Sequence, residues 1–180
     1  MQASTNTSAI IVMGVSGSGK STIAAALARH IGFDCEDGDS YHPASNVKKM
    51  QAGIPLTDDD RWPWLRAIAD DIDRRAATGH PFVVSCSALK RAYRDVLVHG
   101  RSDVQLVYLK GPRDLIAERL AQRKGHFMPP SLLDSQLATI EEPTPNENAV
   151  IVDIDAPINQ IVAAIVHRLQ PFLKPGSLAS

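Results

Sequence analysis

A chain of 180 residues has the size of a single domain and is long enough to bury a three-layer core. Its 44% hydrophobic and 22% charged residues are typical of globular proteins, and the formal net charge of -1 argues against a general nucleic-acid or membrane-surface binder. We expect no signal peptide and no membrane span, and therefore a cytoplasmic protein. Cys35 and Cys86 lie in or beside predicted buried strands, which favours small apolar thiols over a metal–thiolate site.

The first strong pattern is a phosphate-binding loop at residues 14–21, which fit GxxxxGK[ST] at every fixed position. The apolar run 9–13 before it predicts a buried parallel strand, and Ile23, Leu27 and Ile31 recur afterwards at helical spacing. Backbone N–H groups of such a loop surround a phosphate at the positive end of a helix. We expect Lys20 to reach the β- and γ-phosphates and the Ser21 hydroxyl to bind Mg²⁺. The flanking elements disfavour the alternative, a glycine-rich turn that binds nothing.

Downstream, predicted strands and helices alternate along the chain. We predict further strands at residues 33–37, 81–86, 104–109 and 149–153. We predict further helices at residues 43–53, 58–79, 88–98, 112–125 and 157–169, the second of them capped by Thr57. This alternation, with nearly continuous apolar strands, favours a three-layer α/β/α fold around a parallel sheet of five strands.

Ligands of such a sheet bind beyond the carboxyl ends of its strands. That rule selects the loops at residues 14–21, 37–42, 85–91, 110–113 and 153–157. Prolines bracket a short amphipathic segment between residues 126 and 148, which we interpret as a mobile lid. We therefore predict one P-loop kinase domain over 1–180, with a core at about 9–170, a lid at about 124–147 and flexible ends at 1–8 and 173–180.

Two carboxylates, Asp37 and Asp39, follow the second predicted strand. Phosphoryl transfer needs a positioned nucleophile, a metal ion and neutralisation of charge. We assign Asp39 to the acceptor hydroxyl and Asp37 to the water shell of Mg²⁺. Alone, Asp-Gly-Asp would be interpreted as a turn, but the neighbouring phosphate loop favours the functional interpretation. The third strand ends in Ser85-Cys86-Ser87, without the acidic residue of a Walker B strand, which disfavours a motor-type ATPase.

Cations near the same edge of the sheet suggest an anionic substrate. Lys90 and Arg91 begin a predicted helix, where cations oppose the helix dipole, so a stability role is weak. Arg61, beside two tryptophans, is able to bind a carboxylate in bidentate fashion. The alternatives remain open: Arg61 pairs with Asp58, or Lys90 and Arg91 are solvated.

More basic residues gather where a helix meets the predicted lid. Arg119 and Arg123 are placed to fold over the triphosphate, neutralise the transition state and exclude water, whereas Lys124 fits an ordinary helix C-terminus. His42 and His126 are candidate hydrogen-bond partners of substrate hydroxyls, and each is equally an ordinary surface histidine. Arg119 is also a candidate to stack on the adenine, with the loop 155–157 at its edge.

The sequence strongly resembles gluconokinases of the small P-loop kinase type over about residues 10–169. The resemblance is carried by residues 13–22 (MGVSGSGKST), Asp37-Gly38-Asp39 with His42-Pro43, Asn46, 48–50, 53–56 (GIPL), Asp58 with 60–65 (DRWPWL), 86–91 (CSALKR) with 93–95, 125–128 (GHFM) and Ser135-Gln136. Many families share the phosphate loop, but DRWPWL and CSALKR are much more specific. Leu137 departs from the aromatic residue expected after Ser-Gln, which affects lid or subunit packing more than chemistry.

The resemblance implies ATP:D-gluconate 6-phosphotransferase activity, with Mg²⁺, giving 6-phospho-D-gluconate and ADP. It also implies a nucleoside-monophosphate-kinase-like fold with strand order 2-3-1-4-5, a mobile lid and a homodimer. Gluconate needs an anion clamp, hydroxyl partners and a base near its terminal hydroxyl. The expected substrate-binding residues are Asp39, His42, Arg61, Lys90, Arg91 and His126.

The remaining expected site residues fall into three sets. The expected catalytic residues are Lys20, Asp39 and Arg123. The expected nucleotide-binding residues are Gly14, Ser16, Gly17, Ser18, Gly19, Lys20, Ser21, Thr22, Arg119 and Arg123, and the metal-binding residues are Ser21 and Asp37. Two rival functions remain: the same chemistry on another acceptor, such as shikimate or a nucleoside monophosphate, and a regulatory protein that binds ATP without turnover.

Overall fold

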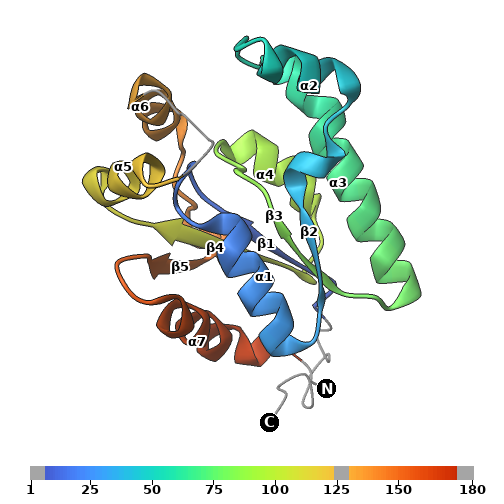
Figure 1. Ribbon diagram of the computed structural model, residues 1–180. Coiled ribbons are helices and arrows are strands. Elements are labelled where there is room, and N and C mark those ends of the chain that lie inside the picture. Colours follow the sequence, from blue (N-terminus) through green and yellow to red (C-terminus); the bar gives the residue numbers. More distant parts are fainter. Residues whose placement is uncertain (1–6, 124–129, 174–180) are drawn as a thin grey trace.

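The computed structural model describes residues 7–123 and 130–173 and shows a parallel sheet of five strands in the order β2-β3-β1-β4-β5 (Figure 1). The strands are β1 (Ala9–Met13), β2 (Asp34–Asp37), β3 (Phe82–Ser85), β4 (Val104–Lys110) and β5 (Val150–Asp153). The helices are α1 (Lys20–Ile31), α2 (Ala44–Gln51), α3 (Asp58–Thr78), α4 (Arg91–Val98), α5 (Arg113–Ala121), α6 (Pro130–Thr139) and α7 (Ile158–Leu169). The expected strand order is confirmed.

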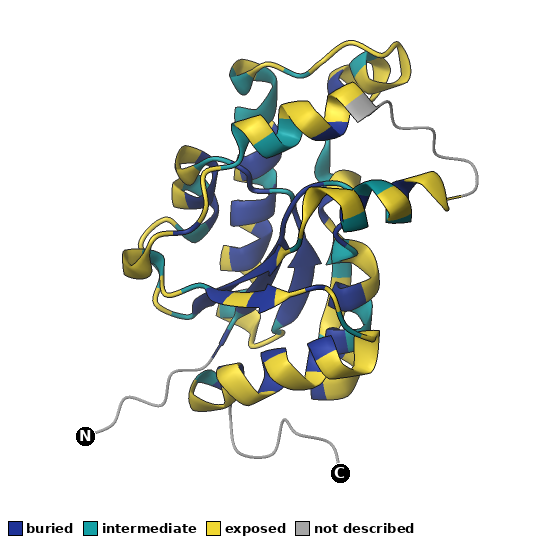
Figure 2. Cartoon of the chain, turned by 90° about the vertical axis from the view of Figure 1, so that its left-hand side faces the viewer, coloured by how far each residue is buried: buried dark blue, intermediate teal, exposed yellow. Residues whose placement is uncertain are grey.

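Helices cover the sheet on both faces, which explains why its central strands are buried along almost their whole length and are mostly apolar (Figure 2). In β1, Ile10 and Val12 pack into the cluster that contains residues of α1, α5 and α7. Ile11 and Met13 point the other way, into the cluster formed with α3 and α4. All five residues of β1 are fully buried, so the strand that precedes the phosphate loop is held rigidly from both sides.

The start of α3 is fixed by local hydrogen bonds, as Thr57 predicts. Thr57 and Asp60 form a capping box, in which the Thr57 hydroxyl accepts from the Asp60 N–H and the Asp60 carboxylate accepts from the Thr57 N–H. Lys49 of α2 also donates to Asp60 at 2.8 Å. This hydrogen bond, together with the Thr57 N–H, holds the pKa of Asp60 at about 2. The cap thereby links α2 to α3.

Two helix boundaries and the burial of one cysteine differ from the predictions. The helix expected from residue 88 begins only at Arg91, because Ala88 has a left-handed backbone with φ of 45°. The helix expected to reach residue 125 ends at Ala121. Cys35 is exposed, because β2 lies at the edge of the sheet and is short and polar, whereas Cys86 is buried as expected.

The segment predicted as a lid is only partly described, since residues 124–129 lie outside the described residues. Helix α6 lies beyond the carboxyl ends of the strands, at the upper end of Figure 1, where α2 also lies. The later part of the segment is anchored: Pro143 is buried and Glu147 pairs with Arg94 of α4. The lid itself stays a prediction.

At the opposite end of the molecule the described ends of the chain meet: the Thr7 hydroxyl donates to the Phe172 carbonyl at 2.6 Å. Most residues of the ends expected to be flexible fall outside the described ranges. Among the helices in the described part of the chain, none is long and apolar enough to cross a membrane.

Candidate active site

The phosphate loop connects β1 to α1 and is shaped by its own hydrogen bonds. Gly19, directly before α1, has φ of 91°, which an L side chain would disfavour. The Ser18 hydroxyl and the Lys20 ammonium donate to the Val15 carbonyl at 2.7 and 3.1 Å. Burial lowers the pKa of Lys20, although the charge of Asp39 opposes this shift. The lysine is therefore held inside the loop, with a carboxylate nearby.

The two carboxylates after β2 lie beside this loop. The Asp37 carboxylate accepts from the Asp39 N–H at 2.9 Å, and the Ser21 hydroxyl donates to it at 3.4 Å. Ser21 and Asp37, the predicted metal residues, are thus brought together from two different elements. The side chain of Asp39 is 84% exposed, and its carboxylate lies 4.0 Å from Nε2 of His42.

Gly38, between the two carboxylates, permits the close contact between the loop after β2 and the end of β3. A Cβ at this position would lie 2.1 Å from the Ser85 carbonyl oxygen, so no larger residue fits. Trp64 of α3 donates its indole N–H to the Gly38 carbonyl at 2.7 Å. The His42 ring stacks on Trp64 with centroids 4.2 Å apart. Helix α3 therefore holds the position of both carboxylates.

A cavity of about 490 Å³ joins these groups at the carboxyl ends of the strands. Ten of its lining residues were expected at the site from the sequence: Ser16, Gly17, Gly19, Lys20, Ser21, Asp37, Asp39, His42, Arg61 and Arg123. The side chain of His42 is only 4% exposed, and burial lowers its pKa, so the ring is neutral at pH 7. The phosphate loop and the predicted base face one space.

The three predicted clamp cations have different surroundings. Arg61 lines the cavity, donates to the Tyr93 hydroxyl at 3.4 Å and lies 3.8 Å from Asp58. Lys90 does not line the cavity, but its ammonium lies 3.3 Å from the same Asp58 carboxylate. Tyr93 also donates to Asp58. Arg61 therefore lines the cavity and also lies close to Asp58, the partner that the alternative interpretation gives it.

Arg91 lies outside this cavity, contrary to its predicted role as a clamp residue. Its guanidinium donates to Asp95 at 2.9 Å and to the Thr144 hydroxyl at 3.1 Å, and it lies 3.6 Å from Glu147. These partners hold the side chain against α4 and the 144–147 turn. The sequence alone did not indicate this position, because Thr144 and Glu147 are more than fifty residues away from Arg91 along the chain.

Other predicted nucleotide residues support the loop without lining the cavity. Gly14 and Ser18 are buried within the loop, and Thr22 is exposed on α1. Arg119 of α5 donates to the Ile154 carbonyl at 2.7 Å, which joins it to the loop proposed to edge the adenine. His126 lies outside the described residues.

Sequence reasoning gave no role to several residues that line the cavity. They are Met50, Leu56, Trp64, Ser85, Cys86, Ser87, Leu120, Leu132 and Gln136. Burial raises the pKa of Cys86 to about 12, so this residue remains a thiol. Trp64 and Gln136 belong to segments that carry the family resemblance, and this membership was the feature of the sequence that pointed to a role at the site. Their contacts with Gly38 and Ser16 could not be derived from spacing.

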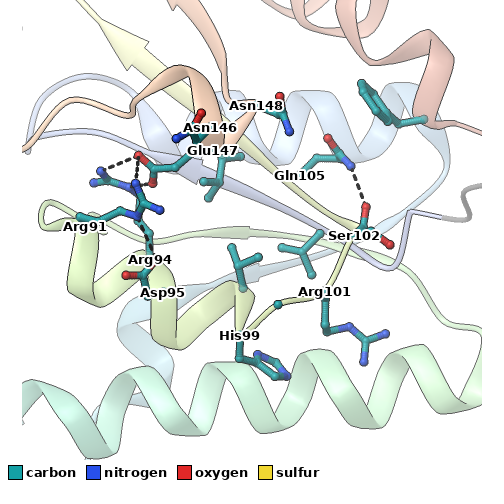
Figure 3. Close-up of a pocket in the computed structure, with 15 residues that line it drawn as sticks. Arg91, Arg94, Asp95, His99, Arg101, Ser102, Gln105, Asn146, Glu147 and Asn148 are labelled. Carbon is teal, nitrogen blue, oxygen red and sulfur yellow. Dashed lines mark hydrogen bonds and ion pairs between the residues drawn. The ribbon is translucent and has the colours of Figure 1, made fainter.

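A second cavity of about 570 Å³ lies beside the start of β4, away from the phosphate loop (Figure 3). Its most buried charges, Arg94 and Glu147, are paired with each other, and Arg101 is paired with Asp103 at 2.6 Å. These charges of the cavity therefore already have partners within the protein. The phosphate-loop cavity, in contrast, is lined by the cations Lys20 and Arg123 together with the carboxylates of Asp37 and Asp39.

Comparisons with known proteins agree with this geometry. The family profile described as "AAA domain" matches residues 10–143. The chain is 46% identical over 178 residues to a probable gluconokinase of Mus musculus, covering 89% of this chain and 97% of that protein. It is 44% identical over 161 residues to the thermoresistant gluconokinase of Escherichia coli (strain K12), covering 89% and 92%. The crystal structure of a gluconokinase from Sinorhizobium meliloti 1021 superimposes with a TM-score of 0.83 at 47% identity, covering 91% and 92%.

Proposed function

This chain belongs to the gluconokinase family, and we propose that it transfers the γ-phosphoryl group of ATP to the primary hydroxyl of D-gluconate, giving 6-phospho-D-gluconate and ADP. One observation supports this most directly: the phosphate loop and Asp39 line the same cavity. Phosphoryl transfer depends mainly on positioning and charge, so a shared space for the donor phosphate and the acceptor base is its main requirement.

On the donor side, the loop N–H groups and Lys20 bind the phosphates of ATP. Arg123 faces the same cavity, and its charge is close enough to Lys20 to contribute to lowering the lysine's pKa. We assign Arg123 to the negative charge that develops on the transferred group. Arg119 and the segment after β5 then form one side of the adenine site.

On the acceptor side, Asp39 orients the primary hydroxyl of gluconate and accepts its proton as the oxygen attacks the γ-phosphorus. The bond to the β–γ bridging oxygen breaks, and ADP leaves with that oxygen. His42, which is neutral and stacked on Trp64, offers a hydrogen bond to another hydroxyl of the substrate. His126 keeps its predicted role at a substrate hydroxyl as a proposal only, because it lies outside the described residues.

Arg61 is the residue that we assign to the gluconate carboxylate. It reaches the cavity, and its guanidinium is held by Tyr93 and Asp58. Lys90 shares the Asp58 carboxylate and adds positive charge behind Arg61. Two cations share one carboxylate here, so a net positive charge remains for an anionic acceptor. Arg91 is not needed for this clamp.

The oxygen groups beside the loop fit Mg²⁺, which prefers hard oxygen ligands and keeps several waters. Ser21 and Asp37 would hold the ion, the hydroxyl directly and the carboxylate through water. When bound, Mg²⁺ supplies neutralisation of phosphate charge. We also retain two expectations as proposals: a homodimer, which the family resemblance implies, and a cytoplasmic location.

The test is a coupled ADP-release assay with ATP and Mg²⁺, in which D-gluconate is compared with shikimate, nucleoside monophosphates and no acceptor. Strong turnover with gluconate alone is the expected result. Turnover with a different acceptor only would keep the kinase chemistry and refute the acceptor assignment. ATP binding without turnover on any acceptor would favour the regulatory alternative.

A further inference from the structure

Gln136 contacts the phosphate loop directly, although 120 residues separate it from Ser16. Its Oε1 accepts from the Ser16 N–H at 2.7 Å, and its Nε2 donates to the Ser16 hydroxyl at 3.2 Å. The first of these hydrogen bonds is short and fixes the orientation of the amide. A primary amide carries two N–H donors, and only one of them points to Ser16.

Helix α6 holds this amide rigidly. Leu133 is 1% exposed and belongs to the core cluster, so it fixes the helix against the sheet. Asp134 accepts from the Arg113 guanidinium of α5 at 3.1 Å through its second oxygen. Just after the helix, the Glu141 N–H donates to the Leu89 carbonyl at 2.8 Å. Gln136 therefore projects from an element that is anchored on several sides.

Gln136 also lies at the proposed site of phosphoryl transfer, because it lines the same cavity as Lys20, Asp39 and Arg123. The transferred phosphoryl group has to lie between the phosphate loop and Asp39. A neutral donor that is fixed in advance stabilises developing negative charge without reorganisation.

We propose that Gln136 is a further catalytic residue, whose side-chain Nε2 donates a hydrogen bond to an oxygen of the γ-phosphoryl group while its Oε1 stays on the Ser16 N–H. This inference rests on the proposed function, since it needs ATP in the loop. In this proposal Ser16 has a positioning role, because its N–H holds the Gln136 amide whose other end reaches the phosphoryl group.

Gln136→Leu tests the proposal, because it removes the donor without adding charge. We expect kcat to fall about 10²- to 10³-fold, the effect of losing one such donor. ATP affinity, measured by calorimetry without acceptor, should fall about 10-fold or more, while ADP affinity should stay within about twofold. Gln160→Leu, on the exposed side of α7, is the matched control and should change neither value.

A purely structural role predicts a different pattern. If Gln136 only shapes the loop, Gln136→Leu should weaken ATP and ADP equally, and this outcome would overturn the proposal. Gln136→Glu keeps the acceptor for Ser16 but lacks the donor, so recovery of kcat in this variant would also overturn it. Wild-type protein without turnover on gluconate would instead refute the proposed function, and the ATP-to-ADP comparison would still test Gln136.

Discussion

Arg94 and Glu147 form a buried ion pair, with Nε of the arginine 2.6 Å from Oε1 of the glutamate and side-chain exposures of 1% and 6%. Arg94 also donates to the Ala88 and Leu89 carbonyls at 3.0 and 3.2 Å. The segment 87–90 and the turn 144–147 therefore depend on one guanidinium.

Arg94→Met should lower the free energy of unfolding by about 3–5 kcal/mol, because it leaves the Glu147 charge buried without its partner. Urea denaturation followed by circular dichroism measures this loss. The double variant with Glu147→Met should be less destabilised than the single one, since both charges are then gone. A double variant as unstable as the sum of the two singles would contradict the pairing.

Asp39→Asn should remove the general base while keeping the size and hydrogen-bonding capacity of the side chain. We expect kcat with gluconate to fall at least about 100-fold, because general-base catalysis contributes about 10²- to 10⁴-fold. ATP binding, measured by calorimetry, should remain nearly unchanged. Asp59→Asn, in the exposed first turn of α3, is the control. Unchanged turnover in Asp39→Asn would refute the assignment of the base.

Arg61→Ala should raise KM for gluconate about 10- to 100-fold, since a hydrogen bond to a charged group is worth about 1.5–3 kcal/mol. The preference for gluconate over sorbitol, which lacks the carboxylate, should fall in the same proportion. Steady-state kinetics with both acceptors measure it. Arg66→Ala, exposed on the same helix, should leave both values unchanged. A KM effect that is equal for gluconate and sorbitol would assign Arg61 to hydroxyl binding instead.

Asp37→Asn should raise the Mg²⁺ concentration needed for half-maximal activity about 10- to 100-fold, the usual effect of changing an outer-shell metal partner. The asparagine oxygen still accepts from the Asp39 N–H, so the loop should keep its shape. Magnesium titrations of activity measure the shift. Asp34→Asn, exposed at the start of the same strand, provides the comparison. If the magnesium requirement stayed the same in both variants, the metal assignment would be wrong.

His42 should make folding depend on pH. Its pKa in the folded protein lies below the ordinary value because the ring is buried, so the unfolded chain binds this proton more readily. Stability from this group is complete above pH 6.5 and declines as the pH falls toward the folded-state pKa. His42→Gln should therefore lose less stability than the wild type between pH 7 and 5 in urea denaturation. His80→Gln is the exposed control, and equal pH slopes in wild type and His42→Gln would contradict this origin.

The sequence predicted most of the fold because its signals are local. The apolar run 9–13 is recognisable as a buried strand from its own residues, and the capping box of Thr57 and Asp60 fixes the start of α3 locally. The start of α4 was misplaced because the backbone there depends on tertiary contacts: the Ala88 carbonyl is bound by Arg94, a buried side chain that also pairs with Glu147, 53 residues away. Cys35 was mispredicted because an edge strand leaves its residues exposed.

The site residues also divide into those that the sequence predicts and those that only the folded chain reveals. Lys20 and Ser21 follow from one contiguous motif, and the phosphate loop is therefore readable from the sequence alone. The different surroundings of Arg61 and Arg91 were not predictable, because they are decided by Tyr93 and Glu147, which only the folded chain brings near. Gln136 was visible as part of a family pattern, but its contact with Ser16 was not.

The hydrogen bond from Trp64 to the Gly38 carbonyl also bears on which acceptors fit. Arg61 stands on the same helix as Trp64, and Asp39 follows Gly38, so this one bond links the proposed clamp for the carboxylate to the proposed base for the hydroxyl. The carboxylate and the primary hydroxyl of an acceptor must therefore match a fixed distance between Arg61 and Asp39. Sugar acids with a shorter carbon chain should reach only one of the two groups, which makes the protein a selector of chain length as well as of charge.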